Sequence, residues 1–133
     1  MNSVPKISFE DFKKVEVTVG KILTVEKVPD TDKLLKLQVD FGVTPVSVAS
    51  TDSPEPSMEN VARDIRQIVS GIAPYFSDIQ VLIGRKCMFV TNLEPRVIRG
   101  LESNGMLFAV STEDGKFSLL EPSEDVPPGT KAK

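Results

Sequence analysis

The stretch from Asn92 to Met106 holds the side chains of this sequence that are best suited to binding a ligand. Arg96 and Arg99 follow Pro95, whose ring stiffens the chain, and a glycine closes each side of the polar turn around Ser103-Asn104. A stiff loop that displays guanidinium groups is suited to contact with phosphate. The alternatives are solvated loop charge for the arginines and, for Ser103 and Asn104, hydrogen bonds that satisfy the turn backbone.

Further cations precede this loop. Arg85 and Lys86 begin the apolar run before it, so that residues 85–100 carry four cations and one anion, although the whole chain has a net charge of −3. Residues 102–125 carry six acids and one lysine. The uneven distribution predicts a polarised surface with a local basic patch that the whole-chain charge conceals. Lys33 is another candidate phosphate contact, and Met106 is either a core residue or a contact.

The residue types needed for catalysis or for a metal site are scarce. The chain has no histidine, the commonest general base and metal ligand, and it has one cysteine. Cys87 lies in an apolar run, which indicates a small buried side chain and not a nucleophile. Asp30 and Asp32 lie in an ordinary turn with no third ligand nearby. We therefore expect no catalytic site, no metal and no cofactor.

Length and composition indicate one domain over residues 1–133. Of the 133 residues 40% are hydrophobic and 26% charged, as in ordinary globular proteins. A Pro/Ser-rich acidic stretch at 43–64 is interpreted as an insertion. No apolar run approaches the roughly 20 residues that span a bilayer, and no signal-peptide pattern opens the chain, so we expect no membrane partner and a cytoplasmic location.

The hydrophobic periodicity predicts the elements that must position the loop. The pattern indicates an all-β chain with an N-terminal helical turn capped by Ser8, and a first strand that bends at Gly20. A helix between the third and fourth strands is predicted to begin at Ser77 and end at Gly84. The other predicted strands span 35–41, 65–72, 87–91, 106–111 and a C-terminal extension at 117–120. Five strands with that helix are typical of an oligonucleotide/oligosaccharide-binding (OB) barrel, with the basic loop joining strands four and five.

The aromatic content bears on the kind of nucleic acid. The chain has no Trp, one Tyr and seven Phe, several of them in core-phase positions. Single-stranded nucleic acid is usually held on aromatic stacking platforms, so their scarcity favours a folded RNA bound by shape and phosphates.

Several ordered blocks of the sequence resemble one known family. They are similar to the tRNA-binding domain appended to bacterial methionyl-tRNA synthetase, which is related to free-standing tRNA-binding proteins, a cytokine and a small secretion chaperone. The resemblance covers nearly the whole chain apart from 43–64. The blocks are VEVTVGKI at 15–22, DKLLKLQVDFG at 32–42, RQIVSGI at 66–72, NLEPR at 92–96, GLESNGML at 100–107 and VPPGTK at 126–131.

The resemblance implies a non-catalytic OB-fold module that grips the outer corner of tRNA and assists methionyl-tRNA synthetase. It implies tRNA and the catalytic part of the synthetase as partners, and a homodimer formed through 7–12 and 117–120. The alternative is a dimeric chaperone or protein-interaction module on the same fold. Together with the cations noted above, the implied tRNA-binding residues are Lys33, Arg85, Lys86, Asn92, Arg96, Arg99, Ser103 and Met106.

Overall fold

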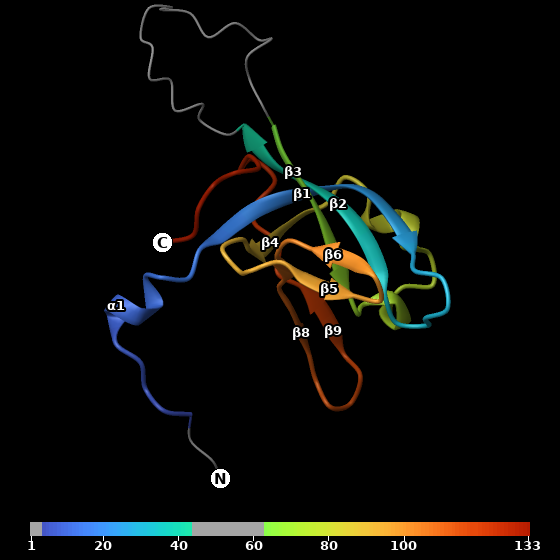
Figure 1. Ribbon diagram of the computed structural model, residues 1–133, viewed down its shortest axis with the longest axis horizontal. Helices are drawn as coiled ribbons and strands as arrows, with labels where there is room; N and C mark the ends of the chain where they lie inside the picture. The colour runs from blue at the N-terminus through green and yellow to red at the C-terminus, as the bar shows by residue number, and fades with distance from the viewer. Residues whose placement is uncertain (1–3, 44–62) are drawn as a thin grey trace, which may run out of the picture.

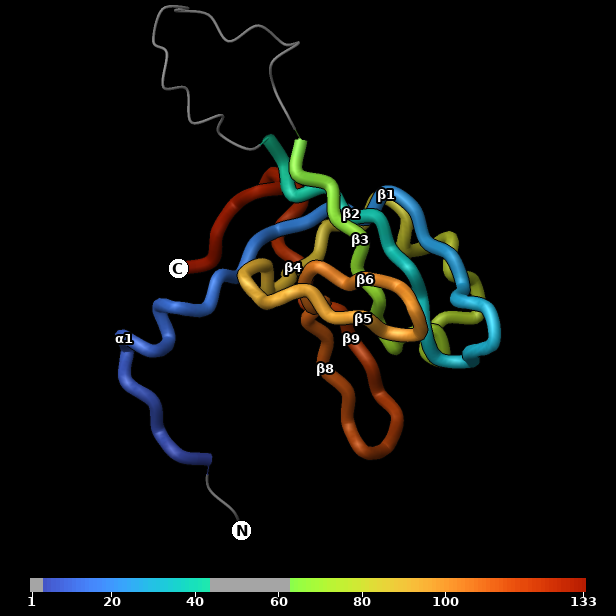
Figure 2. Tube along the Cα trace, in the orientation of Figure 1, coloured from blue at the N-terminus to red at the C-terminus, as the bar shows by residue number. Residues whose placement is uncertain are grey.

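A curled antiparallel sheet forms the body of the protein (Figures 1 and 2). The computed structural model describes residues 4–43 and 63–133. The sheet has the strand order β3-β2-β1-β4-β7, and two small hairpins, β5–β6 and β8–β9, complete the fold. The strands are β1 Val17–Lys27, β2 Leu35–Val43, β3 Arg63–Ser70, β4 Lys86–Val90, β5 Arg96–Ile98, β6 Leu101–Ser103, β7 Met106–Leu107, β8 Ala109–Ser111 and β9 Phe117–Leu119.

The curl brings the two edges of the sheet together. In β3, one edge strand of the sheet, the carbonyl oxygen of Gln67 accepts a hydrogen bond of 2.9 Å from the backbone N–H of Asn104. Asn104 lies just before β7, the other edge strand. The five-stranded sheet therefore closes toward a barrel, and the predicted all-β, OB-like fold is confirmed.

The strand β1 turns the corner of the barrel. Its first half pairs with β4 up to Lys21, and from Lys21 onward it pairs with β2. A Cβ atom at Gly20 would lie 2.6 Å from the side chains of both Phe41 and Val39. Only glycine lets the two layers approach this closely, and the change of partner matches the bend predicted there.

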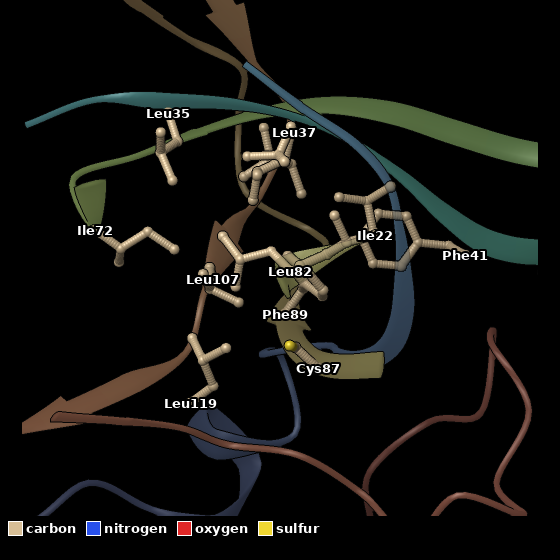
Figure 3. Close-up of a cluster of buried hydrophobic side chains, with 13 residues drawn as sticks. Ile22, Leu35, Leu37, Phe41, Ile72, Leu82, Cys87, Phe89, Leu107 and Leu119 are labelled. Atoms are coloured by element: carbon tan, nitrogen blue, oxygen red, sulfur yellow. The ribbon is translucent and has the colours of Figure 1, made fainter. Parts of the chain in front are cut away.

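A single hydrophobic core fills the barrel. Figure 3 shows its side chains pointing toward one another from β1, β2, β4 and the segments that follow β3. The rings of Phe41 and Phe89 meet edge to face with centroids 5.2 Å apart. Leu82 and Cys87 are fully buried in the same cluster.

The predicted helix between the third and fourth strands is wrong in type and start. Two short 3₁₀ helices stand there, η2 Ala73–Tyr75 and η3 Ile79–Leu82. Asp78, not Ser77, caps η3, and its carboxylate accepts a 3.1 Å hydrogen bond from the N–H of Gln80. The connection ends at Gly84, as predicted, and its φ of +88° favours glycine.

Two other predictions concern the ends of elements. The helix α1, Phe9–Phe12, begins as predicted, because the Ser8 hydroxyl accepts a 3.1 Å hydrogen bond from the N–H of Asp11. The insertion placed at 43–64 lies largely outside the described residues, yet Val43 belongs to β2 and pairs with Arg63, the first residue of β3. Within the described ranges, no helix is long and apolar enough to cross a membrane.

The predicted fifth strand at 106–111 is divided. Its first part, β7, pairs with β4 through Leu107 and Phe89, whereas its second part, β8, pairs with β9. The N–H of Phe108 still donates a 3.0 Å hydrogen bond to the carbonyl of Met88 in β4, and the chain then forms the C-terminal hairpin.

Candidate nucleic-acid interface

The segment predicted as a basic loop is a β-hairpin. The strands β5 and β6 pair with Arg96 opposite Ser103 and Ile98 opposite Leu101. The turn is made by Arg99 and Gly100, with φ of +53° and +79°. Two-residue hairpin turns favour positive φ at both positions, which accounts for the glycine and places Arg99 at the tip.

Ser103 anchors this hairpin to the barrel. Its hydroxyl accepts a 3.0 Å hydrogen bond from the N–H of Val69 in β3 and donates one of 3.3 Å to the carbonyl of Gly105. Ser103 is 4% exposed. In this structure the hydroxyl serves the alternative role considered above, which is to satisfy the backbone near the turn.

The hairpin tip and the β1–β2 turn lie at the same end of the barrel. The N–H of Asn104, just after β6, donates to the carbonyl of Gln67, whereas the hydroxyl of Ser103 accepts from the N–H of Val69. The segment of β6 therefore runs antiparallel to β3, and the hairpin tip points toward the Ser70 end of that strand. At that end the carbonyl of Lys33 accepts a 3.0 Å hydrogen bond from the N–H just after β3, at Ala73. These two connections are the loops with which OB folds hold oligonucleotides.

Three of the predicted binding residues have exposed side chains at these loops, and a fourth is exposed at the start of β7. Lys33 lies in the β1–β2 turn, Arg96 and Arg99 on the hairpin, and Met106, which is 46% exposed, at the start of β7. The connection 92–105, which contains the hairpin, carries Glu94 and Glu102 beside its two arginines. The net charge of this connection is therefore balanced, so its two arginines do not form a strongly basic patch.

Arg85 and Lys86 are not brought to this surface. They lie at the start of β4 and face the C-terminal segment. The ammonium of Lys86 donates a 2.6 Å hydrogen bond to the backbone carbonyl of Glu124. Arg85 lines a cleft with Glu121 of the C-terminal segment.

Asn92 is exposed but its amide is already engaged. Its oxygen accepts a 2.8 Å hydrogen bond from the N–H of Glu16, and its nitrogen donates to the carbonyl of Lys14. The side chain therefore holds the N-terminal segment against the beginning of the 92–105 connection.

The outer face of β2 and β3 adds residues that the sequence reasoning did not select. Lys36 and Gln38 alternate with buried positions along β2 and are half-buried. Lys36 pairs with Glu26 at 3.1 Å, and the amide of Gln38 donates to Gln67 at 3.3 Å. Their alternation with apolar residues was visible in the sequence and was the signal that could have identified this face.

A polar network closes the other end of the barrel. The carboxylate of Glu16 accepts a 2.6 Å hydrogen bond from the hydroxyl of Thr91 and lies 3.1 Å from the ammonium of Lys131. The hydrogen bond from Thr91, followed by the interaction with Lys131, lowers the pKa of Glu16 despite partial burial. This network ties the C-terminal segment to β1, where Lys131 bridges to Thr18.

Cys87 is buried as expected, and burial raises its pKa to about 12, so the thiolate is disfavoured. Among residues 4–43 and 63–133, no three Cys, Asp or Glu side chains are grouped closely enough to hold a metal ion.

Comparison with known proteins assigns the family. Residues 57–131 match the family described as "Putative tRNA binding domain". The chain belongs to this tRNA-binding domain family. A solved structure of a MetRS related protein from Pyrococcus horikoshii is 35% identical, with a TM-score of 0.75, over 98% of this chain and 100% of that one.

Other members of the tRNA-binding domain family are parts of methionine–tRNA ligases. The ligase of Methanoregula boonei is 42% identical over 97% of this chain, and that of Caldanaerobacter subterraneus subsp. tengcongensis is 40% identical over 94%. The chain spans about 16% of the length of these ligases, and what it matches is a tRNA-binding domain, a non-catalytic module. The chaperone CsaA of Bacillus anthracis, 23% identical with a TM-score of 0.72 over 97% of this chain and 100% of that one, shares the fold.

Proposed function

We propose that this chain is a non-catalytic module that grips the outer corner of tRNA by shape and phosphate contacts and thereby assists methionyl-tRNA synthetase. The proposal rests on one observation. The β1–β2 turn and the β5–β6 hairpin lie at the same end of the barrel, and they expose Lys33, Arg96 and Arg99. Guanidinium and ammonium groups on neighbouring turns suit a phosphate backbone.

The balanced charge of the 92–105 connection supports an auxiliary role. A surface with few unopposed cations neutralises few phosphates and releases few counterions from the RNA. The isolated module should therefore bind RNA with modest affinity. A module held beside the catalytic part of the synthetase acts at a high effective concentration, so modest affinity suffices. We accordingly propose the catalytic part of the synthetase as its partner, in the cytoplasm.

The described residues share one core, which supports our proposal that 1–133 is one domain with an insertion at 43–64. The exposed apolar residues of the N-terminal arm, Phe9 and Phe12 among them, support the proposal that two copies form a homodimer.

The hairpin assignment is tested by the salt dependence of tRNA binding. Arg96→Gln and Arg99→Gln, singly and together, should weaken binding and reduce the slope of log K against log salt by about 0.7 to 0.9 for each lost phosphate contact. Lys6→Gln with Lys13→Gln removes two charges from the N-terminal arm and serves as the matched control. Equal slopes for the arginine and control variants would refute the assignment.

A further inference from the structure

A cleft that the proposed interface does not use lies between η2 and the β8–β9 hairpin. Pro74, Tyr75 and Phe76 form one wall, Phe117 with its neighbours forms another, and Arg85 and Glu121 complete the lining. Its volume is about 510 Å³. Sites for small ligands have roughly 300–1,000 Å³, so the cleft can hold a nucleotide-sized group.

The cleft contains a supported aromatic platform. The rings of Tyr75 and Phe117 are stacked, with centroids 4.1 Å apart and planes at 11°. Phe76 packs edge-on against Phe117 at 5.7 Å and, like Phe117, packs on the hydrophobic core. Tyr75 is 46% exposed although Phe117 covers one face of its ring. A fixed ring with a solvent-facing side is the arrangement on which proteins stack nucleobases.

A cation suited to phosphate stands beside this platform. Arg85 is half-buried, and among the described residues its guanidinium has no hydrogen bond and no carboxylate within 4.0 Å. Glu121 lines the same cleft, and its negative charge opposes the attraction of Arg85 for phosphate. An aromatic face next to a guanidinium without a partner matches the base and the phosphate of a nucleotide better than it matches an apolar peptide.

The platform is continuous with the end of the barrel that carries the β1–β2 turn. Tyr75 closes the η2 turn that begins at Ala73, and the N–H of Ala73 is bonded to the carbonyl of Lys33. Figure 1 shows the segment after β3 beside the turn between β1 and β2. An RNA held at Lys33 would therefore have the platform within reach of its next unpaired nucleotide.

We propose that this cleft binds an unpaired nucleotide of the tRNA, with the base stacked on Tyr75 and a phosphate paired with Arg85. The proposal rests on the proposed function in taking RNA as the ligand. It adds a base-stacking contact to an interface otherwise made of phosphate contacts.

Tyrosine fluorescence gives a direct readout of the stacking. Tyr75 is the only tyrosine and the chain has no tryptophan, so the emission comes from this ring alone. A single-stranded oligoadenylate of about five nucleotides should quench it saturably, because a stacked base is an efficient quencher and this length suits a small site. Free tyrosine amide with the same RNA corrects for absorption. Absence of saturable quenching, or saturable quenching by an unstructured peptide alone, would overturn the proposal.

Affinity measurements with variants separate stacking from folding. Tyr75→Ala should lower tRNA affinity about tenfold, within the range of base–aromatic stacking, while Tyr75→Phe keeps the ring and should stay within about twofold of the parent. Arg85→Gln should weaken binding severalfold and Glu121→Gln should strengthen it. Equal affinity of Tyr75→Ala and the parent chain would refute the cleft.

The two proposals fail in different ways. If the oligoadenylate quenches Tyr75 while the Arg96 and Arg99 variants keep the parent salt slope, the cleft stands and the hairpin assignment falls. If the salt slope changes and Tyr75 is not quenched, the hairpin stands and the cleft falls.

Discussion

Several side chains with the chemistry of RNA contacts are used by the fold itself. The hydroxyl of Ser103 and the amide of Asn92 hold backbone groups, and the ammonium of Lys86 is bonded to a carbonyl. Short polar side chains beside turns find backbone partners locally, since buried backbone groups must be satisfied. At the residue scale, therefore, hydrogen bonds to the backbone identify Ser103, Asn92 and Lys86 as residues that serve the fold, whether or not they are exposed.

Removal of the Ser103 hydroxyl tests this division. Ser103→Ala leaves the buried N–H of Val69 without its acceptor, which should lower the free energy of unfolding by about 1–3 kcal/mol. Chemical denaturation measures the loss, with exposed Ser111→Ala as the control. The affinity for tRNA should not change, and a lower affinity at full stability would make Ser103 a contact after all.

Glu16 should make stability depend on pH. Its pKa is lowered in the folded state by Thr91 and Lys131, so its stabilising effect is present above the unfolded value near 4.5 and is lost as the pH falls through the folded value. Because its side chain is 40% exposed, we expect no more than about 1 kcal/mol. Glu16→Gln should be less stable than the parent at pH 7, and the difference should vanish in acid. A difference that persists at pH 3 would contradict the linkage.

At the scale of elements, the shape of the barrel depends on a close approach between β1 and its neighbours that only glycine permits, because a side chain would collide with the core. The strand β1 passes from β4 to β2 next to Gly20, where the side chains of Phe41, Val39 and Phe89 occupy the space of a Cβ atom. The hairpin β5–β6 depends on glycine for a different reason, which is the positive φ of its two-residue turn, because no atom lies within 4 Å of a Cβ added at Gly100. These elements hold the β1–β2 turn and the hairpin at one end of the barrel.

Gly20→Ala should destabilise the fold by about 1–3 kcal/mol, because the core must shift to admit the methyl group. Gly71→Ala is the matched control, since no atom lies within 4 Å of the added Cβ and its φ is not positive. Thermal or urea unfolding of both variants measures the difference. Equal free energies of unfolding for the two variants would show that the core around Gly20 accommodates the added methyl group without cost.

At the scale of the whole molecule, an apolar arm stands apart from the barrel. Figure 1 shows α1 and the residues before β1 extending away from the sheet. Ile7, Phe9 and Phe12 are 64%, 70% and 52% exposed. Apolar side chains gathered on such an arm favour burial against another surface, which supports the proposed homodimer.

Phe9→Asp with Phe12→Asp should convert a dimer into a monomer, because two desolvated carboxylates oppose association. Light scattering after size exclusion should give twice the chain mass for the parent and one chain mass for the variant. Glu10→Gln, on the same helix, is the control and should remain dimeric. A monomeric parent would refute the dimer.

Local patterns in the sequence predicted much of this fold. Alternation identified β1 and β2, Ser8 identified the start of α1, and Gly20 identified the bend, because each depends on neighbouring residues. The start of η3 was missed by one residue, since Ser77 and Asp78 are both suitable caps and only the backbone angles decide between them.

By itself, the sequence determined the family and the all-β barrel, because its blocks and its hydrophobic alternation are local and specific. Only the tertiary structure decided which cations share a surface. Arg85 and Arg99 belong to the same charged stretch of sequence, yet Arg85 lines a cleft with Glu121 of the C-terminal segment, whereas Arg99 lies at the tip of the hairpin. Tyr75 and Phe117, 42 positions apart, form one stack. Charge along a sequence is one-dimensional, whereas a binding surface is assembled by strand pairing across the sheet.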